Sequence, residues 1–257
     1  MNMESAKTFL VIGGATGLGL SAAQALVSAG HNVGILGRNP NSLASALETL
    51  GIQTLGIEAN ATDPSASEAL LGRVLEKWGA IDGLYHVAGG SGRAEGDGPV
   101  HELTDEGLDH TLDLNLKSLI YSNRTVIRQL QKQGQGGAIL NMGSVLGFSP
   151  SPKHFVTHAY AAAKSAIIGY TKSVAATYAS ENIRANVIAP ALVQTPMSQR
   201  ATTNAEILDF ITTKQPLDGG RIGHPRDLDD AVLFLLTDAS KYVTGQVLAV
   251  DGGWSVS

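Results

Sequence analysis

The sequence contains no cysteine, which excludes disulfides, thiolate catalysis and cysteine-ligated metals. Charged residues are few, at 16%, and the net charge of −5 argues against a general nucleic-acid binder, which would show a basic stripe. No apolar run is long enough to span a bilayer, and the opening MNMESAKTF has neither the apolar core nor the cleavage site of a signal peptide. We therefore expect a cytoplasmic protein without nucleic-acid or membrane partners.

What the sequence does contain is an apolar chain of 257 residues, 43% hydrophobic, in which short apolar runs alternate with helical patterns. This alternation predicts a doubly wound, Rossmann-type α/β fold, with a mostly parallel seven-stranded sheet and helices on both faces. No composition break marks a boundary, so residues 1–257 are expected to form a single domain. The expected strands are 8–12, 32–36, 54–58, 83–87, 138–141, 185–188 and 246–250, and the expected helices are 18–29, 39–50, 64–78, 104–131, 158–180 and 226–237.

The first expected strand ends in a glycine-rich turn, directly before a helix. Gly13, Gly17 and Gly19 follow a Gly-x3-Gly-x-Gly spacing, which differs from the usual Gly-x-Gly-x-x-Gly dinucleotide fingerprint. Glycines at this place let the backbone turn tightly and let a pyrophosphate approach the N–H groups of the helix. A turn without function is the alternative, but the position between strand and helix favours nucleotide binding.

The end of the second strand bears on cofactor choice. Enzymes that prefer NAD usually place a carboxylate here for the ribose hydroxyl, whereas an arginine suits a 2′-phosphate. Arg38 offers the guanidinium fork that binds phosphate, and no acidic residue precedes it at position 37. The sequence therefore favours NADP(H), with NAD(H) possible and a solvated, structural Arg38 as the alternative.

Tyr160 and Lys164 are four residues apart in an expected helix, so their side chains lie on one face, which is largely apolar. A free tyrosine has a pKa near ~10, and a neighbouring ammonium favours its phenolate form. Tyr160 is therefore a candidate general acid/base and Lys164 the group that lowers its pKa. On the spacing alone, a chance YxxxK remains an alternative.

Asn115 lies in a leucine stripe, where a structural amide would be the simpler interpretation.

Taken together, these residues resemble the short-chain dehydrogenase/reductase family in its compact single-domain branch, over about residues 8–254. The resemblance is carried by motifs that occur in order along the chain: Gly13-x3-Gly17-x-Gly19, Ala88-Gly89, Asn115, Ser144, Tyr160-x3-Lys164, Asn186…Pro190, Thr195-Pro196, Val243-Thr244-Gly245-Gln246 and Asp251-Gly252-Gly253.

The resemblance implies an NAD(P)(H)-dependent oxidoreductase that transfers hydride between nicotinamide and an alcohol or carbonyl compound. Tyr160 would exchange a proton with the substrate oxygen, which Ser144 would hold in place. Lys164 would bind the nicotinamide ribose and lower the Tyr160 pKa, and Asn115 would hold a water that relays protons. The residues implied to contact the cofactor are Gly13, Thr16, Gly17, Leu18, Gly19, Arg38, Asn60, Ala61, Ala88, Gly89, Tyr160, Lys164, Pro190, Val193 and Thr195.

Several positions depart from the family pattern. His86-Val87 stands where the family has two asparagines, and we interpret His86 as structural. Asn60 replaces an aspartate near the adenine. His154 and His158 are four apart but have no evident third ligand, so we expect no metal there and interpret them as lining or covering the substrate side. Arg93 lies in a polar loop, and we interpret it as a solvated arginine; contact with an anionic or polar substrate is the alternative.

The substrate remains open between ketones, sugars and β-keto acyl groups. For a 3-oxoacyl-acyl-carrier-protein reductase a basic patch is expected where this chain has Ala175-Ala176-Thr177, which weakly opposes that assignment. A protein that binds the nucleotide without catalysis, as a sensor or scaffold, is the alternative from another class. The resemblance also implies a homotetramer.

Overall fold

The computed structural model describes residues 6–257 and shows one seven-stranded sheet in which every neighbouring pair is parallel. The strand order is β3-β2-β1-β4-β5-β6-β7, so the chain starts in the middle and winds outwards in both directions. The predicted Rossmann-type fold is confirmed. The strands are β1 (Thr8–Ile12), β2 (Asn32–Gly37), β3 (Thr54–Glu58), β4 (Gly83–His86), β5 (Gly137–Met142), β6 (Ile183–Pro190) and β7 (Val247–Val250).

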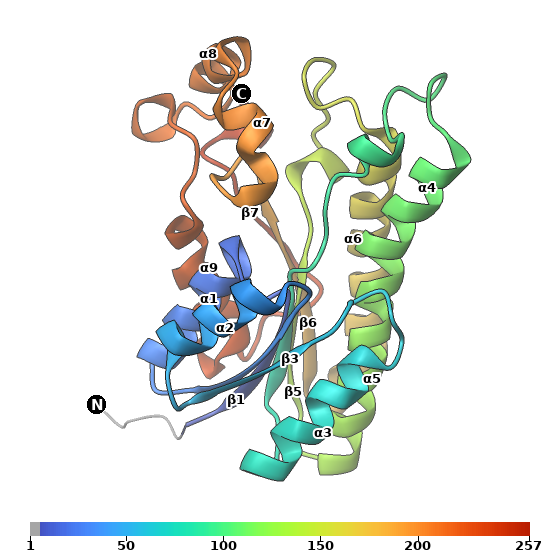
Figure 1. The fold of residues 1–257 in the computed structure, drawn as a ribbon. Coiled ribbons are helices and arrows are strands. Elements are labelled where there is room, and N and C mark those ends of the chain that lie inside the picture. The colour runs from blue at the N-terminus through green and yellow to red at the C-terminus, as the bar shows by residue number, and fades with distance from the viewer. Residues whose placement is uncertain (1–5) are drawn as a thin grey trace.

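Helices cover both faces of the sheet (Figure 1). Side chains of a strand alternate between faces, and in β1 Phe9 and Val11 pack into one core while Leu10 and Ile12 pack into the other. The first core is closed by α1 (Gly17–Ser28), α2 (Pro40–Leu50) and α9 (Asp229–Leu236). The second is closed by α3 (Ala66–Trp78), α5 (Ser118–Gln133) and α6 (His158–Tyr178).

The structure differs from the expected helices in two regions. The single helix expected over 104–131 is divided into α4 (Asp105–Leu112) and α5 by a π-helical turn, Asp113–Lys117. After β6, two helices that were not predicted rise above the sheet, α7 (Gln199–Thr202) and α8 (Ala205–Lys214) (Figure 1). Their residues bury only one narrow face, including Ala201, Ile207 and Ile211, so the periodic signal is weak.

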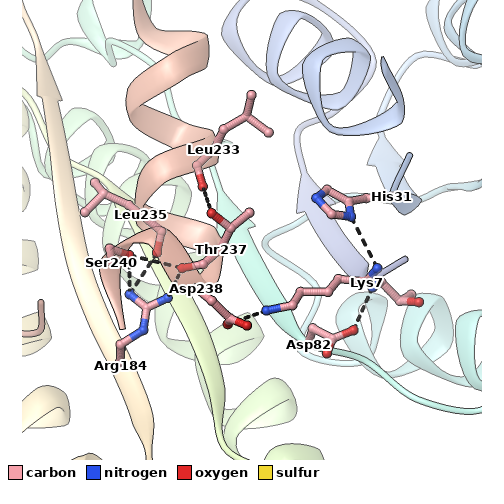
Figure 2. A network of polar contacts seen from close by, with 10 residues as sticks. Lys7, His31, Asp82, Arg184, Leu233, Leu235, Thr237, Asp238 and Ser240 are labelled. Atoms are coloured by element: carbon pink, nitrogen blue, oxygen red, sulfur yellow. Dashed lines mark hydrogen bonds and ion pairs between the residues drawn. The ribbon is translucent and has the colours of Figure 1, made fainter. Parts of the chain in front are cut away.

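The amino ends of the strands are tied together by a polar network (Figure 2). The guanidinium of Arg184, on β6, donates to the carbonyls of Leu235 and Thr237 and to the hydroxyl of Ser240. Nearby, Lys7 forms an ion pair with Asp238. These contacts fix the segment after α9 under the sheet and leave the opposite edge, at the carboxyl ends, for ligands.

Candidate active site

A cleft of about 730 Å³ opens at the carboxyl ends of the strands. Its wall contains Ser144, Tyr160, Lys164 and every residue that the sequence analysis assigned to the cofactor. Of the predicted site residues, all of which the structure describes, only Asn115 lies outside this wall. Residues from the ends of six strands, β1 to β6, are therefore brought together in one site.

The glycine turn after β1 is shaped by close backbone contacts. A Cβ on Gly19 would lie 2.1 Å from the carbonyl oxygen of Gly13, and a Cβ on Gly13 would lie 2.8 Å from the amide nitrogen of Ala88. Helix α1 begins directly after this turn; its N-cap Thr16 makes no side-chain capping bond, and its first turn holds no acidic residue. The turn therefore offers the helix N-terminus to an anion, which fits the pyrophosphate of a dinucleotide.

The part of the cleft where the sequence analysis predicts the adenosine is lined by residues at the ends of β2 and β3. Arg38 is exposed there, and no carboxylate within residues 6–257 lies within ion-pair distance of it. Asn60 accepts a hydrogen bond from the amide of Thr62 at 3.1 Å. The acidic residue at this edge, Glu58, pairs in register with Gly37 but does not line the cleft.

Tyr160 and Lys164 lie one turn apart on α6, as predicted. The ammonium nitrogen of Lys164 lies 5.4 Å from the centroid of the Tyr160 ring and donates to the carbonyl of Met142 at 3.0 Å. Lys164 is only 2% exposed, and Ser144, which follows β5, is 6% exposed. A hydrogen bond joins the side chains of Ser144 and Tyr160. A hydroxyl, a phenol and a buried ammonium thus meet at the cleft wall.

Burial controls the protonation of Lys164 and Tyr160. Burial lowers the pKa of Lys164 to about 7, because the site disfavours its charged form. The pKa of Tyr160 is raised, because burial outweighs the opposing hydrogen bond with Ser144. In the protein alone, desolvation of the phenol therefore dominates the Tyr160 pKa. The lowering of this pKa by Lys164 stays a prediction.

Asn115 lies in the π-helical turn, behind the cleft wall. Its amide nitrogen donates to the carbonyls of Gly90 and Thr111, and its Oδ1 accepts from the amide of Gly90 at 3.1 Å. A Cβ on Gly89 would lie 2.8 Å from this Oδ1 and 3.4 Å from the Lys164 nitrogen, so the lack of a side chain at Gly89 leaves space next to both groups. Both donors of Asn115 are engaged, which leaves only an acceptor position for a water.

His86 lies at the end of β4 and is fully buried. Its Nδ1 is 2.7 Å from the hydroxyl of Ser122, and its Nε2 is 3.3 Å from that of Ser118. Burial, followed by the charge of Lys164, lowers the pKa of His86 to about 3, so the ring is neutral at physiological pH. Both ring nitrogens are occupied by α5, and His86 links this helix to the sheet outside the cleft.

The loop after β4, which looked polar and mobile in the sequence, is anchored by Asp97. This carboxylate is 2% exposed and accepts hydrogen bonds from the backbone amides of Ala159, at 3.1 Å, and Tyr160, at 2.9 Å. It therefore occupies the N-terminus of α6 and holds the backbone of the proposed catalytic tyrosine. Sequence reasoning missed it, because the contact joins residues 62 and 63 positions apart.

An aromatic cluster forms the wall of the cleft far from the glycine turn. The rings of Phe155, Phe210 and Trp254 lie 5.6–6.5 Å apart, and His154 packs against Phe210 at 5.4 Å. Phe155 and Trp254 line the cleft, whereas His154 and His158 do not. Of the expectation that these histidines line or cover the substrate side, the lining is therefore wrong, while His154 packs against the aromatic wall. Within residues 6–257 no three histidine, aspartate or glutamate side chains gather as a metal site requires.

Two residues of the far wall, Arg200 and Trp254, were not singled out from the sequence. Trp254 follows the Asp251-Gly252-Gly253 motif, and Asp251 accepts bonds from the amides of Gly253 and Ser255, both at 2.9 Å, which turns the chain beside the cleft. A tryptophan directly after that motif was an available signal. Arg200, on α7, could be found only by knowing that this helix folds over the site.

Comparison with known proteins places this fold and cleft among the α/β oxidoreductases that depend on a nicotinamide dinucleotide. The sequence model of a family described as enoyl-(acyl carrier protein) reductase matches residues 13–255. The chain is 34% identical over 249 residues to 2-dehydro-3-deoxy-D-gluconate 5-dehydrogenase of Dickeya dadantii, which covers 96% of this chain and 95% of that protein. It is 35% identical over 251 residues to a 3-oxoacyl-acyl-carrier-protein reductase of Chlamydia trachomatis, covering 96% of each.

Solved structures agree with these sequence matches. A short-chain type dehydrogenase/reductase from Mycobacterium ulcerans superposes with a TM-score of 0.89 at 32% identity, over 97% of this chain and 90% of that one. The chain therefore belongs to the short-chain dehydrogenase/reductase family. Within residues 6–257, no helix has both the length and the apolar composition needed to cross a membrane.

Proposed function

We propose that the protein transfers hydride between the nicotinamide of NADP(H) and the reacting carbon of a ketone, aldehyde or secondary alcohol. The observation that carries this proposal is the meeting of Ser144, Tyr160 and the buried Lys164 on the cleft wall. A buried ammonium beside a phenol is costly to keep without a use for its charge, which favours catalysis over a nucleotide-binding sensor or scaffold.

In this mechanism the bound nicotinamide supplies or accepts the hydride, and the protein manages position and protons. Tyr160 gives a proton to the substrate oxygen during reduction and takes it back during oxidation. Ser144 donates a hydrogen bond to the same oxygen and holds it in line. Lys164 binds the ribose hydroxyls and stabilises the phenolate when it is protonated. Asn115 holds a water, through a remaining acceptor position, that exchanges protons with Lys164.

The cofactor-binding part of the proposal assigns the pyrophosphate to the turn from Gly13 to Gly19, and the nicotinamide to the segment that ends at Thr195. Arg38 favours NADP(H), because an unpaired guanidinium beside the adenosine end suits a 2′-phosphate and no acid replaces it. NAD(H) is the second candidate cofactor.

The substrate class extends from ketones and sugars to β-keto acyl groups. Relatives include enzymes named for a deoxy-gluconate and for cis-4-hydroxycyclohexanecarboxylate, as well as 3-oxoacyl-acyl-carrier-protein reductases. A carrier-protein substrate is the second candidate, supported by those reductases. The absence of basic side chains at Ala175, Ala176 and Thr177 on α6 disfavours it.

The test is the variant Tyr160→Phe, assayed with NADPH against a panel of ketones and aldehydes. Turnover is expected to fall about 10²–10⁴-fold, because the proton donor is lost, while NADPH affinity stays within a few-fold. Tyr170→Phe, on the same helix, is the matched control and should keep full activity. Unchanged turnover in Tyr160→Phe would refute the mechanism, and NADPH binding without any turnover in the wild type would favour the sensor.

We also propose a homotetramer in the cytoplasm, in line with the family resemblance. Three exposed hydrophobic side chains near the end of the chain support association: Tyr242 is fully exposed, and Phe234 and Leu248 are 41% and 37% exposed. Light scattering should report four chains per particle; a monomer would overturn this part of the proposal.

A further inference from the structure

We propose that Arg93 and Arg200 form an anion-binding pair that holds a carboxylate of the substrate at the far end of the cleft. This inference deepens the proposed function, on which it rests, by naming a chemical group that the substrate carries away from its reacting carbon.

The two arginines come from distant parts of the chain and meet on one atom. Arg93 lies in the loop after β4, and Arg200 lies on α7, after β6; both line the cleft. Each donates from Nη2 to the carbonyl oxygen of His154, Arg93 at 3.4 Å and Arg200 at 3.1 Å. Two guanidinium groups are therefore held close together although their charges repel each other.

The shared carbonyl belongs to a residue in an uncommon conformation. His154 has a φ of 61°, in the left-handed region that non-glycine residues rarely adopt. Its ring is held against Phe155 and Phe210. The aromatic cluster thus fixes the carbonyl that gathers the two arginines, which indicates a built arrangement and not two freely moving surface side chains.

Neither arginine has an acidic partner in the described part of the chain. No carboxylate of residues 6–257 lies within 4.0 Å of either guanidinium. The charge of Asp97 acts on Arg93, but Asp97 is buried and its oxygens are used by the amides of Ala159 and Tyr160. Both side chains are exposed, and each guanidinium uses one of its five N–H donors on the His154 carbonyl, which leaves donors on both for an anion.

The surroundings favour a carboxylate over a phosphate. Phosphates are commonly bound where guanidinium groups are joined by the free N–H groups of a helix N-terminus. Here the N-terminus of α6 is already occupied by the Asp97 carboxylate. What remains is a pair of planar forks, which match the two oxygens of a carboxylate. The same cleft is lined by two aromatic side chains in contact with each other, Phe155 and Trp254. The geometry thus fits a hydroxy or keto acid with an apolar middle.

Binding is tested by titrating cyclohexanecarboxylate, which has no carbonyl group to reduce, into the protein saturated with NADP⁺. Wild type is expected to bind it at least tenfold more tightly than the uncharged cyclohexanecarboxamide. Arg93→Met and Arg200→Met should each lose about tenfold in affinity for the acid and little for the amide. Arg93→Lys should bind the acid with an affinity between those of wild type and Arg93→Met, because lysine keeps the positive charge but lacks the planar fork of donors. Arg73→Met, at an exposed position of α3, removes the same charge elsewhere and should change nothing.

Turnover of 4-oxocyclohexanecarboxylate and of its methyl ester separates this inference from the proposed function. If the arginine variants raise KM for the acid and leave the ester unchanged, both hold. If the acid binds through the arginines but neither compound is reduced, the anion site stands and the proposed function fails. If the ester is reduced and the acid and amide bind equally, the anion site is wrong. Inorganic phosphate is tested as a competitor for the same site. If it binds more tightly than the carboxylate and loses this affinity in the same arginine variants, the carboxylate assignment is overturned in favour of a phosphate ester.

Discussion

The end of the cleft that we propose for the cofactor is made by turns that each follow a strand directly, whereas the end that we propose for the substrate is assembled from segments far apart in the sequence. Gly13, Gly19 and Arg38 lie within the first two strand–helix units. The far wall combines Arg93 from the loop after β4 with Arg200 from α7 and Trp254 beyond β7. Local geometry therefore dictates the first end, and long-range packing dictates the second.

The strongest test of the local end is Gly19→Ala. Its Cβ would lie 2.1 Å from the Gly13 carbonyl oxygen, a backbone atom that cannot move without opening the turn. We expect a loss of about 2–4 kcal/mol in the free energy of unfolding, measured with denaturant, and a loss of NADPH binding.

The matched control is Gly72→Ala, on helix α3, where an added Cβ meets no atom within 4 Å. This change should stabilise the protein by about 0.5–1 kcal/mol, because alanine loses less conformational entropy in a helix than glycine does. Equal stability of the two variants would show that the turn after β1 tolerates side chains and is not constrained as its backbone contacts imply.

Lys164 joins the two ends, and its burial predicts a pH dependence of stability. Its pKa is about 7 in the folded protein against an ordinary value of 10.5. Between these values the unfolded chain binds more protons than the folded one, so this residue makes the cofactor-free protein more stable as the pH rises. Between pH 7 and 9.5, the free energy of unfolding of wild type should rise by roughly 2–3 kcal/mol relative to that of Lys164→Met, because the variant has no titrating group at this position.

Denaturant unfolding of both proteins across this pH range measures the effect. Lys172→Met, an exposed change on the same helix, serves as the control and should run parallel to wild type. If the difference in free energy of unfolding between wild type and Lys164→Met is the same at every pH, Lys164 keeps its proton throughout. Other groups would then offset the cost of burying its charge.

The sequence was sufficient for the sheet and for the local end of the site. All seven strands are found within about two residues of their expected ends, because buried parallel strands produce apolar runs that are independent of their neighbours. The glycine turn and the pair Tyr160 and Lys164 likewise depend on short spacings. In these features, residues that lie close together in the sequence also lie close together in space.

The substrate end could not be predicted in the same way. Asp97 looks like one more polar residue in a glycine-rich loop, and only the folded chain shows its carboxylate at the start of α6. Arg200 lies on a four-residue helix with no periodic signal. The π-helical turn around Asn115 was also missed, since leucines continue through it at helical spacing. In each case tertiary contacts, and not the preferences of the local sequence, determine the structure.

Asp97→Ala tests whether the long-range contact positions the chemistry. Removing a carboxylate that accepts two backbone N–H bonds at a helix N-terminus should cost about 1–2 kcal/mol of stability. Turnover should fall as Tyr160 loses its fixed place, while NADPH affinity, which depends on the local end, is expected to stay the same. Asp97→Asn keeps one acceptor oxygen and should recover part of both losses. If turnover does not change in Asp97→Ala, α6 is held by its packing alone.

The smallest expected effect concerns Arg38, and it decides how far the local end determines cofactor choice. Paired dissociation constants should show NADPH bound about tenfold more tightly than NADH, a difference of about 1.4 kcal/mol, since the exposed guanidinium meets the 2′-phosphate in partial competition with water. Arg38→Ser should remove this preference by weakening NADPH binding alone, while Arg73→Met leaves it intact. If wild type binds NADH equally well or better, Arg38 does not read the phosphate; alcohols and sugars should then be screened for oxidation before ketones are screened for reduction.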